Sequence, residues 1–297
     1  MRLRQQKNLW ETMFDLHFRN GQLFGVPYLF SPVLLNYNRM IMRELEPDFS
    51  AADLTMEHFI ELLRKADGLG YGGLDFATFA VGFFLSIAHI LAKGDPGIDA
   101  LLDAAKYLKE IKKYSGGDFA EGKTLFVLAP RHNFFHDRFS DYDIAPLPSL
   151  NGIRCNPVAS GTLAVTSKAA DPEKMHDLCE RMLSSEFQEK VTQEKFGIAM
   201  DRRTAMDSMG TSSRRDDFYL SEVKNIHFSH YDYELDTLQE IALAVTDFKN
   251  DAIDFSIFEK ELRKAIRIQI ESEKRHKRFS LLYCAANSIP GRTGQAS

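Results

Sequence analysis

The sequence predicts an α/β protein in two lobes, with a chain that crosses between them. The first observation is the mostly apolar run Asn20–Arg39, which a turn signal opens and which Gly25 and Pro27 interrupt. Such a run favours two extended segments joined by a sharp backbone change. Helical periodicity in most of the remaining chain is the second observation. The third is the composition: 297 residues, 44% hydrophobic and 27% charged, which is typical of one large or two modest globular domains.

Apolar spacing predicts three helices around this run. A short helix is expected within Leu9–Phe18, before the Asn20-Gly21 turn. Asp53–Asp67 has a helical apolar face, and Asp53 or Thr55 is suited to cap it. The glycines of Gly68–Gly73 end that helix. Phe76–Leu91 is apolar on nearly every side, which indicates a buried helix.

The middle of the chain alternates between a helix and short strands. Ile98–Tyr114 is expected to form an amphipathic helix. Phe119–Leu128 contains a turn followed by a short buried strand, and two further strands are expected at Asp141–Pro148 and Gly161–Lys168. Asp171-Pro172 then begins another helix, because proline fits the first helical turn.

The last part is predicted to be helical. Leu235–Phe248 and Phe255–Glu273 both show helical periodicity, and the second helix is expected to end near Phe279-Ser280. Ser288–Ser297 is polar and is expected to be a frayed tail. The cationic run Lys274–Arg278 is expected near a helix end, where it favours the negative end of the dipole.

Charge and cysteine content restrict the function classes. A net charge of −5 and a pI near 6.0 argue against a nucleic-acid-binding surface over the whole chain. Cys155, Cys179 and Cys284 are widely spaced and predict neither a metal site nor a disulfide framework. The basic N-terminus has no continuous apolar region, so we expect no secretory signal and no membrane span in this sequence.

Three enzyme signals are weak. His132 and His136 have the i, i+4 spacing of metal ligands on a helix, but no third ligand is apparent. Ser160 is a possible nucleophile, although Val158–Thr162 lacks the first glycine of a nucleophile elbow. Gly70–Gly73 lacks the lysine of a phosphate-binding loop. We therefore expect no enzyme activity, no cofactor and no metal.

Four phrases, taken in order, resemble the extracellular solute-binding proteins of ABC importers, above all the sugar- and oligosaccharide-binding group. They are NGQLFGVP with YNR ten residues later (Asn20–Arg39), DYDIAPLP (Asp141–Pro148), GTLAVTSK (Gly161–Lys168) and SSEFQ (Ser184–Gln188). Their order and spacing over about Asn20–Lys274 make the resemblance fairly specific. It implies a periplasmic-binding-protein-like two-lobe fold of type II.

The same resemblance implies a division of the chain. It predicts a remnant of the first lobe at 1–19, a hinge crossing at 20–40, the second lobe at 41–156, a return to the first lobe at 157–205, C-terminal helices at 206–280 and a flexible tail at 281–297. Family members usually have roughly a hundred residues before this hinge. We therefore expect the first lobe to be incomplete here, and this chain alone to bind solute weakly or not at all.

The resemblance also implies a site in the cleft. Sugars offer apolar C–H faces and hydroxyls, so aromatic platforms and a few directed polar groups suit them. Tyr28 and Phe76 are expected to stack on a ring, while Asp75 and Arg131 would take paired hydroxyl hydrogen bonds. His132 and Ser160 would each contribute one hydrogen bond. For the aromatic residues core packing is the alternative, for Asp75 it is capping of the following helix, and Asn38 is expected to satisfy local backbone groups.

The expected function is solute capture between two lobes for an ABC importer. The partners implied by the resemblance are a small solute, a sugar above all, and a membrane permease; no nucleic acid is expected. A solute-sensing module of a cytoplasmic transcriptional regulator is the alternative. The family is extracytoplasmic, whereas the absence of a signal in this sequence fits a cytoplasmic location, so the localisation stays open.

Overall fold

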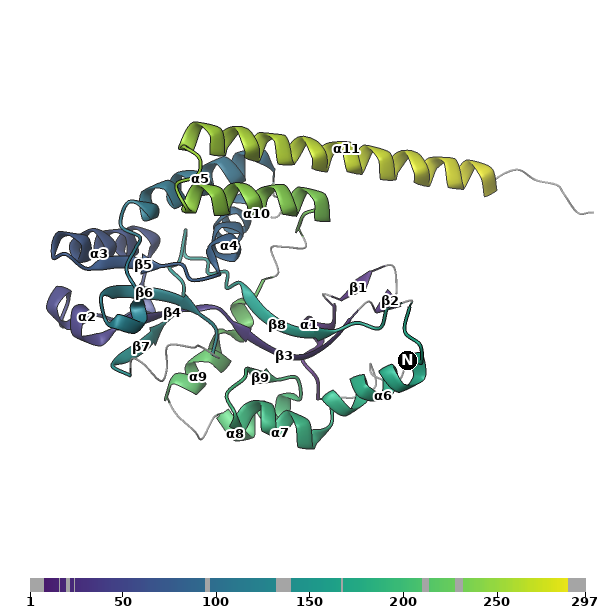
Figure 1. Cartoon of the computed structure of the whole chain (residues 1–297), viewed down its shortest axis with the longest axis horizontal. Coiled ribbons are helices and arrows are strands. Elements are labelled where there is room, and N and C mark those ends of the chain that lie inside the picture. Colours follow the sequence, from purple (N-terminus) through teal and green to yellow (C-terminus); the bar gives the residue numbers. More distant parts are fainter. Residues whose placement is uncertain are drawn as a thin grey trace, which may run out of the picture. The chain divides into compact units, whose positions relative to one another are not determined.

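The computed structural model describes residues 8–15, 17–19, 22–23, 25–93, 97–131, 140–166, 168–209, 214–227 and 232–287. The chain divides into two compact units, Met1–Tyr231 and Asp232–Ser297. The first unit carries all the described strands, and the second consists of helices (Figure 1). None of the described helices is long and apolar enough to cross a membrane.

A three-stranded antiparallel sheet has β3 (Val26–Pro32) at its centre, between β8 (Val158–Leu163) and β9 (Ile198–Ala199). Proline cannot donate to a sheet ladder, so Pro27 in a central strand needs an irregularity. The β3–β8 register shifts between Pro27 and Leu29, which supplies it. The predicted strand Gly161–Lys168 is therefore wrong in its bounds, because pairing with β3 begins three residues earlier, at Val158.

A four-stranded sheet has the order β5-β6-β4-β7. Its strands are β4 (Leu34–Asn38), β5 (Gly72–Asp75), β6 (Thr124–Ala129) and β7 (Tyr142–Ala145). β5 runs parallel to β6, whereas β4 is antiparallel to both β6 and β7. Every residue of β6 is buried, as expected for a strand covered on both faces.

Four helices belong to the part of the chain that also carries this four-stranded sheet. They are α2 (Arg39–Leu45), α3 (Met56–Gly68), α4 (Ala80–Ala92) and α5 (Ile98–Lys112). Thr55 caps α3 as predicted, because its Oγ1 accepts a hydrogen bond from the His58 amide at 3.2 Å. The predicted start of α4 at Phe76 is wrong, since the helix begins at Ala80. A bend at Ala77, with φ of +45°, separates the strand from the helix.

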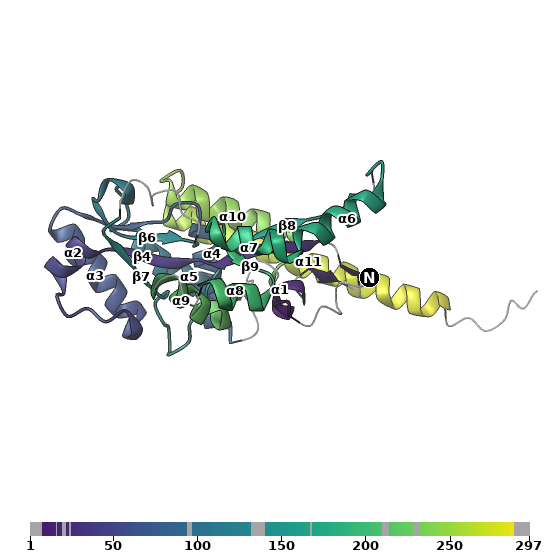
Figure 2. The same cartoon turned by 90° about the horizontal axis from the view of Figure 1, so that it is seen from below.

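The remaining helices of the first unit lie beside the three-stranded sheet or between the sheets. They are α1 (Glu11–Asp15), α6 (Pro172–Met182), α7 (Ser185–Gln193), α8 (Arg202–Met209) and α9 (Arg214–Ser221). Two strands, β1 (Phe18–Arg19) and β2 (Gln22–Leu23), form a hairpin, and short 3-10 turns occupy Ala51–Asp53, Phe119–Glu121 and Glu222–Asn225. Asp171 caps α6 with Pro172 in the first turn, which confirms that predicted start. In both views α7 and α8 lie near β9, whereas α2 and α3 lie at the other end of this unit (Figures 1 and 2).

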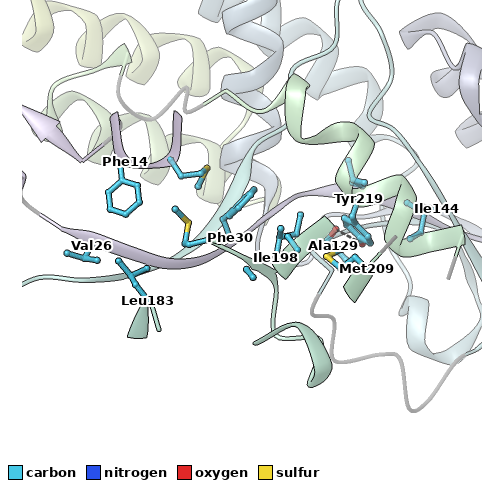
Figure 3. Packing of buried hydrophobic residues seen from close by; sticks show 14 of the residues in the cluster. Phe14, Val26, Phe30, Ala129, Ile144, Leu183, Ile198, Met209 and Tyr219 are labelled. Carbon is cyan, nitrogen blue, oxygen red and sulfur yellow. Dashed lines mark hydrogen bonds between the residues drawn. The ribbon is translucent and has the colours of Figure 1, made fainter. Parts of the chain in front are cut away.

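One hydrophobic core runs through both sheets of the first unit. Phe30 and Ile198 belong to the three-stranded sheet, Ala129 and Ile144 to the four-stranded sheet, and Tyr219 to α9 (Figure 3). All five side chains are buried. Burial of apolar surface is the main favourable term in folding, so this shared core couples the two sheets energetically.

The second unit is a pair of helices, α10 (Leu235–Lys249) and α11 (Phe255–Asn287). Phe258, Leu262 and Ile266 of α11 are buried at the i, i+4 and i+8 positions of one face. The predicted end of α11 near Phe279-Ser280 is wrong, since the helix continues to Asn287. Lys274–Arg278 therefore lies more than two turns before the helix end, and the helix dipole does not explain this cationic run.

Candidate functional site

Three segments of the chain run side by side where the two sheets meet. The Val33 amide, between β3 and β4, donates a hydrogen bond to the Pro157 carbonyl at 2.8 Å. Asn156 in turn donates to the Asn225 carbonyl at 2.8 Å and accepts from the His227 amide at 3.1 Å. β3 thus leads into β4, from one sheet to the other, through Val33, while the motion of the run Asn20–Arg39 as a hinge stays a prediction.

The ends of the strands that lie beside this crossing are all at one end of the four-stranded sheet. We call this end, which is not an edge strand, the crossing edge. β4 begins there, because Leu34 pairs with Ala129 at the end of β6. β5 is parallel to β6, so the residues after Asp75 and after Ala129 emerge at the same edge. Crevices outside the carboxyl ends of strands are the usual ligand sites of open α/β sheets. The crossing edge therefore carries three of the predicted site residues, Asp75, Phe76 and Arg131.

Asp75 and Phe76 leave β5 in a tight turn. The Asp75 Oδ1 accepts a hydrogen bond from the Ala77 amide at 2.7 Å, an Asx turn that supports the left-handed Ala77 backbone. The alternative role of Asp75, capping of α4, is wrong, because the N-cap position of α4 is occupied by Phe79 and not by Asp75. Phe76 is only 4% exposed and packs on Phe83 with ring centroids 6.3 Å apart. Of this pair, Asp75 is thus the one with a half-buried carboxylate beside the crossing edge.

Arg131 is buried and bound to protein groups. Its Nε donates to Asp216 Oδ1 at 2.7 Å, and its Nη1 donates to the carbonyls of Gly197 at 2.7 Å and Thr192 at 3.2 Å. The Arg131 amide also donates to Ser31 Oγ on β3 at 2.8 Å. Arg131 therefore fastens the end of β6 to the three-stranded sheet and to α9. Its predicted contact with a ligand stays a prediction that these bonds do not support.

Tyr28 and Ser160 lie on the neighbouring strands β3 and β8. The half-buried Tyr28 ring covers Gly161, where an added Cβ would lie 2.8 Å from the Tyr28 Cζ. Phe187 of α7 supports the ring edge-on, with centroids 6.1 Å apart. Ser160 is exposed, and its Oγ lies 3.3 Å from Thr162 Oγ1 and 3.4 Å from the Leu29 carbonyl. None of these described contacts is with a histidine, so the nucleophile alternative gains no support.

His17 also lies on this surface, and no pattern in the sequence selects it. Its Nε2 lies 3.3 Å from Thr162 Oγ1, across 145 residues of sequence. Burial lowers the pKa of His17 below its usual value of 6.5, because desolvation disfavours the imidazolium. Only the fold brings His17 and Thr162 together, and no local pattern around Leu9–Phe18 marks the histidine.

Two predicted roles have clear outcomes. Asn38 caps α2, with Oδ1 accepting from the Met40 amide at 2.9 Å, and its Nδ2 donates to the Gly122 carbonyl at 3.0 Å. Its predicted role toward local backbone is thereby confirmed. His132 and His136 lie outside the described residues, so neither their hydrogen bonding nor the metal alternative is tested.

No protein-family model matches the chain, and no curated protein sequence matches it. Solved structures do. An ABC-transporter solute-binding protein from Thermotoga lettingae, bound to α-D-tagatose, is 16% identical over 88% of this chain and 76% of its own, with a TM-score of 0.70.

Two further structures show the same likeness. A Streptococcus pneumoniae solute-binding protein in complex with the blood group A-trisaccharide is 17% identical over 90% of this chain and 76% of its own, with a TM-score of 0.69. UgpB from Mycobacterium tuberculosis, in complex with glycerophosphocholine, is 14% identical over 90% of this chain and 75% of its own, with a TM-score of 0.73. The chain thus has the α/β fold of ABC-transporter solute-binding proteins, which confirms the predicted fold class.

Proposed function

We propose that this chain is the solute-binding component of an ABC importer and captures a carbohydrate or a related small solute between its two sheets. The observation that carries the proposal is the pair of chain crossings at Val33 and Pro157, which lead from one sheet to the other, with Asn225 hydrogen-bonded beside them through Asn156. Two bodies joined by a few chain crossings can close around a ligand by small backbone rotations at those crossings. The three compared proteins are binding proteins, which supports binding rather than catalysis.

The proposed site combines Tyr28 and Ser160 on the three-stranded sheet with Asp75 and Phe76 at the crossing edge. Tyr28 offers an aromatic platform, since its half-buried ring is held by Phe187. Asp75 has one oxygen in the Asx turn, and its second oxygen can accept a hydroxyl. Arg131 and His132 remain in the proposal on the resemblance alone.

The test is ligand-observed saturation-transfer NMR of the 297-residue chain with a panel of mono- and oligosaccharides and glycerophosphocholine. This measurement detects complexes with millimolar dissociation constants, which correspond to a binding free energy of only about −4 kcal/mol. We expect signal from at least one solute, and we expect Tyr28→Ala and Asp75→Asn each to weaken it about tenfold, the loss of one good contact of about 1.4 kcal/mol. Asp67→Asn on the exposed face of α3 is the matched control for Asp75→Asn.

Two outcomes would contradict this proposal. One is the absence of saturation transfer from every solute of the panel. The other is binding that Tyr28→Ala and Asp75→Asn leave unchanged. A permease partner is part of the proposal, and the transport role is favoured over a regulator because the compared structures are transport proteins.

A further inference from the structure

A pocket of about 320 Å³ lies at the outer edge of the four-stranded sheet, away from the crossing edge. Residues of β4, of β7, of α9 and of the segment that precedes α3 line it. They are Tyr37, Phe49, Ser50, Ala51, Ala52, Asp143, Ile144 and Phe218. This volume is within the range of about 300–1,000 Å³ that small-molecule sites occupy. None of these residues belongs to the proposed solute site.

The topology separates this pocket from that site. Tyr37 pairs with Asp143 and lies three residues beyond Leu34, which is about 10 Å along the strand. Asp75 lies on β5, whereas Asp143 of the pocket lies on β7, at the other side of the strand order β5-β6-β4-β7. Three spacings between neighbouring strands separate β5 from β7, which is about 14 Å. A ligand in the pocket would thus contact Tyr37 of β4 and Asp143 of β7, away from the crossing edge.

Aromatic rings form the apolar part of the pocket. Tyr37 and Phe49 meet edge-on, with centroids 5.3 Å apart and planes at 75°, so they form a corner. Phe218 contributes a third ring. All three are half-buried, which leaves part of each ring accessible. Such a corner suits the apolar C–H face of a ring-shaped ligand.

The charge of Asp143, which lines the pocket, is balanced by the neighbouring Arg215. Asp143 Oδ1 accepts from the Ile144 amide at 2.9 Å and lies 3.9 Å from Arg215 Nε. The Arg215 guanidinium lies 4.0 Å from the Tyr142 ring centroid, so it is held over β7. A carboxylate beside a guanidinium favours neither a cation nor an anion strongly. Ligand hydroxyls can donate to the Asp143 carboxylate, and the Ser50 hydroxyl can both donate and accept.

We propose that this pocket is a second binding site, and that it takes a neutral polyhydroxylated ring such as one sugar unit. The Tyr37–Phe49 corner would receive the apolar face of the ring, while Asp143 accepts hydroxyl hydrogen bonds. The site does not depend on the proposed capture between the two sheets. A chain with both sites would bind sugar in this pocket even when the proposed solute site is weakened.

The test uses saturation-transfer NMR on the full chain with D-glucose, D-galactose and D-mannose as separate probes. Tetramethylammonium and methyl phosphate, each observed through its methyl protons, serve as the cationic and anionic comparisons. The background variant is Tyr28→Ala, which is expected to weaken the proposed solute site about tenfold, so that loss of the remaining signal by Asp143→Asn or Ala52→Trp reports on the pocket. In this background we expect at least one sugar to bind, and we expect Asp143→Asn to reduce its signal at least fivefold.

A second variant fills the pocket from the outside. Ala52 is exposed and lines the pocket, so Ala52→Trp places a ring in it without removing a core side chain. We expect Ala52→Trp to abolish sugar binding in the Tyr28→Ala background and to leave the unfolding midpoint unchanged. Asp67→Asn again serves as the control for a lost carboxylate.

Three results would overturn the proposal. They are the absence of sugar binding in the Tyr28→Ala background, sugar binding that both Asp143→Asn and Ala52→Trp leave intact, and selective binding of tetramethylammonium or methyl phosphate that Ala52→Trp removes. Failure of the solute site is distinguishable, because it appears as equal sugar binding by the original chain and by Tyr28→Ala.

Discussion

At the scale of single residues, Arg131 is the residue whose role changes most. Its place after β6 resembles that of a cleft residue, yet its guanidinium bonds to Asp216, Thr192 and Gly197. The side chains of Arg131 and Asp216 are 4% and 7% exposed. A buried charge needs a partner, so each of the two residues requires the other.

We predict that Arg131→Met destabilises the protein by about 3–5 kcal/mol, because Asp216 stays buried without its counter-charge. The double variant Arg131→Met/Asp216→Leu should recover much of the loss, since an apolar pair of similar volume leaves no buried charge. Urea unfolding measures both values. The control is Arg203→Met, which breaks an exposed pair with Asp207 and should leave the midpoint unchanged.

An equal urea-unfolding midpoint for Arg131→Met and the original chain would contradict the structural role of the Arg131–Asp216 pair. A stable Arg131→Met variant that loses solute binding would instead return Arg131 to the solute site.

At the scale of elements, close backbone approach fixes where β5 runs. An added Cβ at Gly72 would lie 2.0 Å from the Gly116 carbonyl oxygen, which is backbone and cannot rotate away. The Gly72 amide also donates to the Lys123 carbonyl at 2.9 Å, next to the start of β6. β5 therefore depends on glycine at this position for its pairing with β6.

We predict that Gly72→Ala destabilises the protein by about 1–3 kcal/mol, the usual cost of overpacking. Gly68→Ala is the matched control, because no atom lies within 4 Å of its added Cβ and the residue is helical. Its free energy of unfolding should stay within about 0.5 kcal/mol of the original value or rise slightly. Urea midpoints of the two variants decide this, and equal losses in both would disprove the packing argument.

At the scale of the whole molecule, the first unit has one core shared by two sheets. Phe30 and Val127 lie on different sheets and belong to the same buried cluster. Trp10, the single tryptophan, packs edge-on to Phe30 at 5.7 Å and donates its Nε1 to the Ala199 carbonyl at 3.1 Å. Its fluorescence therefore reports on the three-stranded sheet.

We predict that the two sheets unfold together. Urea unfolding followed by Trp10 fluorescence should coincide with the loss of hydrogen-exchange protection in β6, because a shared core makes unfolding cooperative. The second unit carries no tryptophan, so Trp10 fluorescence does not report on α10 and α11. Separate midpoints for Trp10 and β6 would show that the sheets unfold independently.

The sequence by itself determined the fold class, most helices and the segment that joins the sheets. Apolar periodicity, the Thr55 cap and the Asp171-Pro172 start are local signals, and they predicted α3 and α6 well. The proposed solute residues rest on the order of four phrases rather than on chemistry visible in any one of them.

Only the tertiary structure decided which of those residues are accessible. Asp216, the partner of Arg131, lies 85 residues away in the sequence, and Thr162, the partner of His17, lies 145 residues away. The second pocket likewise combines residues as distant in the sequence as Tyr37 and Phe218. The bounds of β8 likewise follow from pairing with β3. Long-range contacts of this kind depend on the packing of distant segments, for which local propensity and periodicity carry no signal.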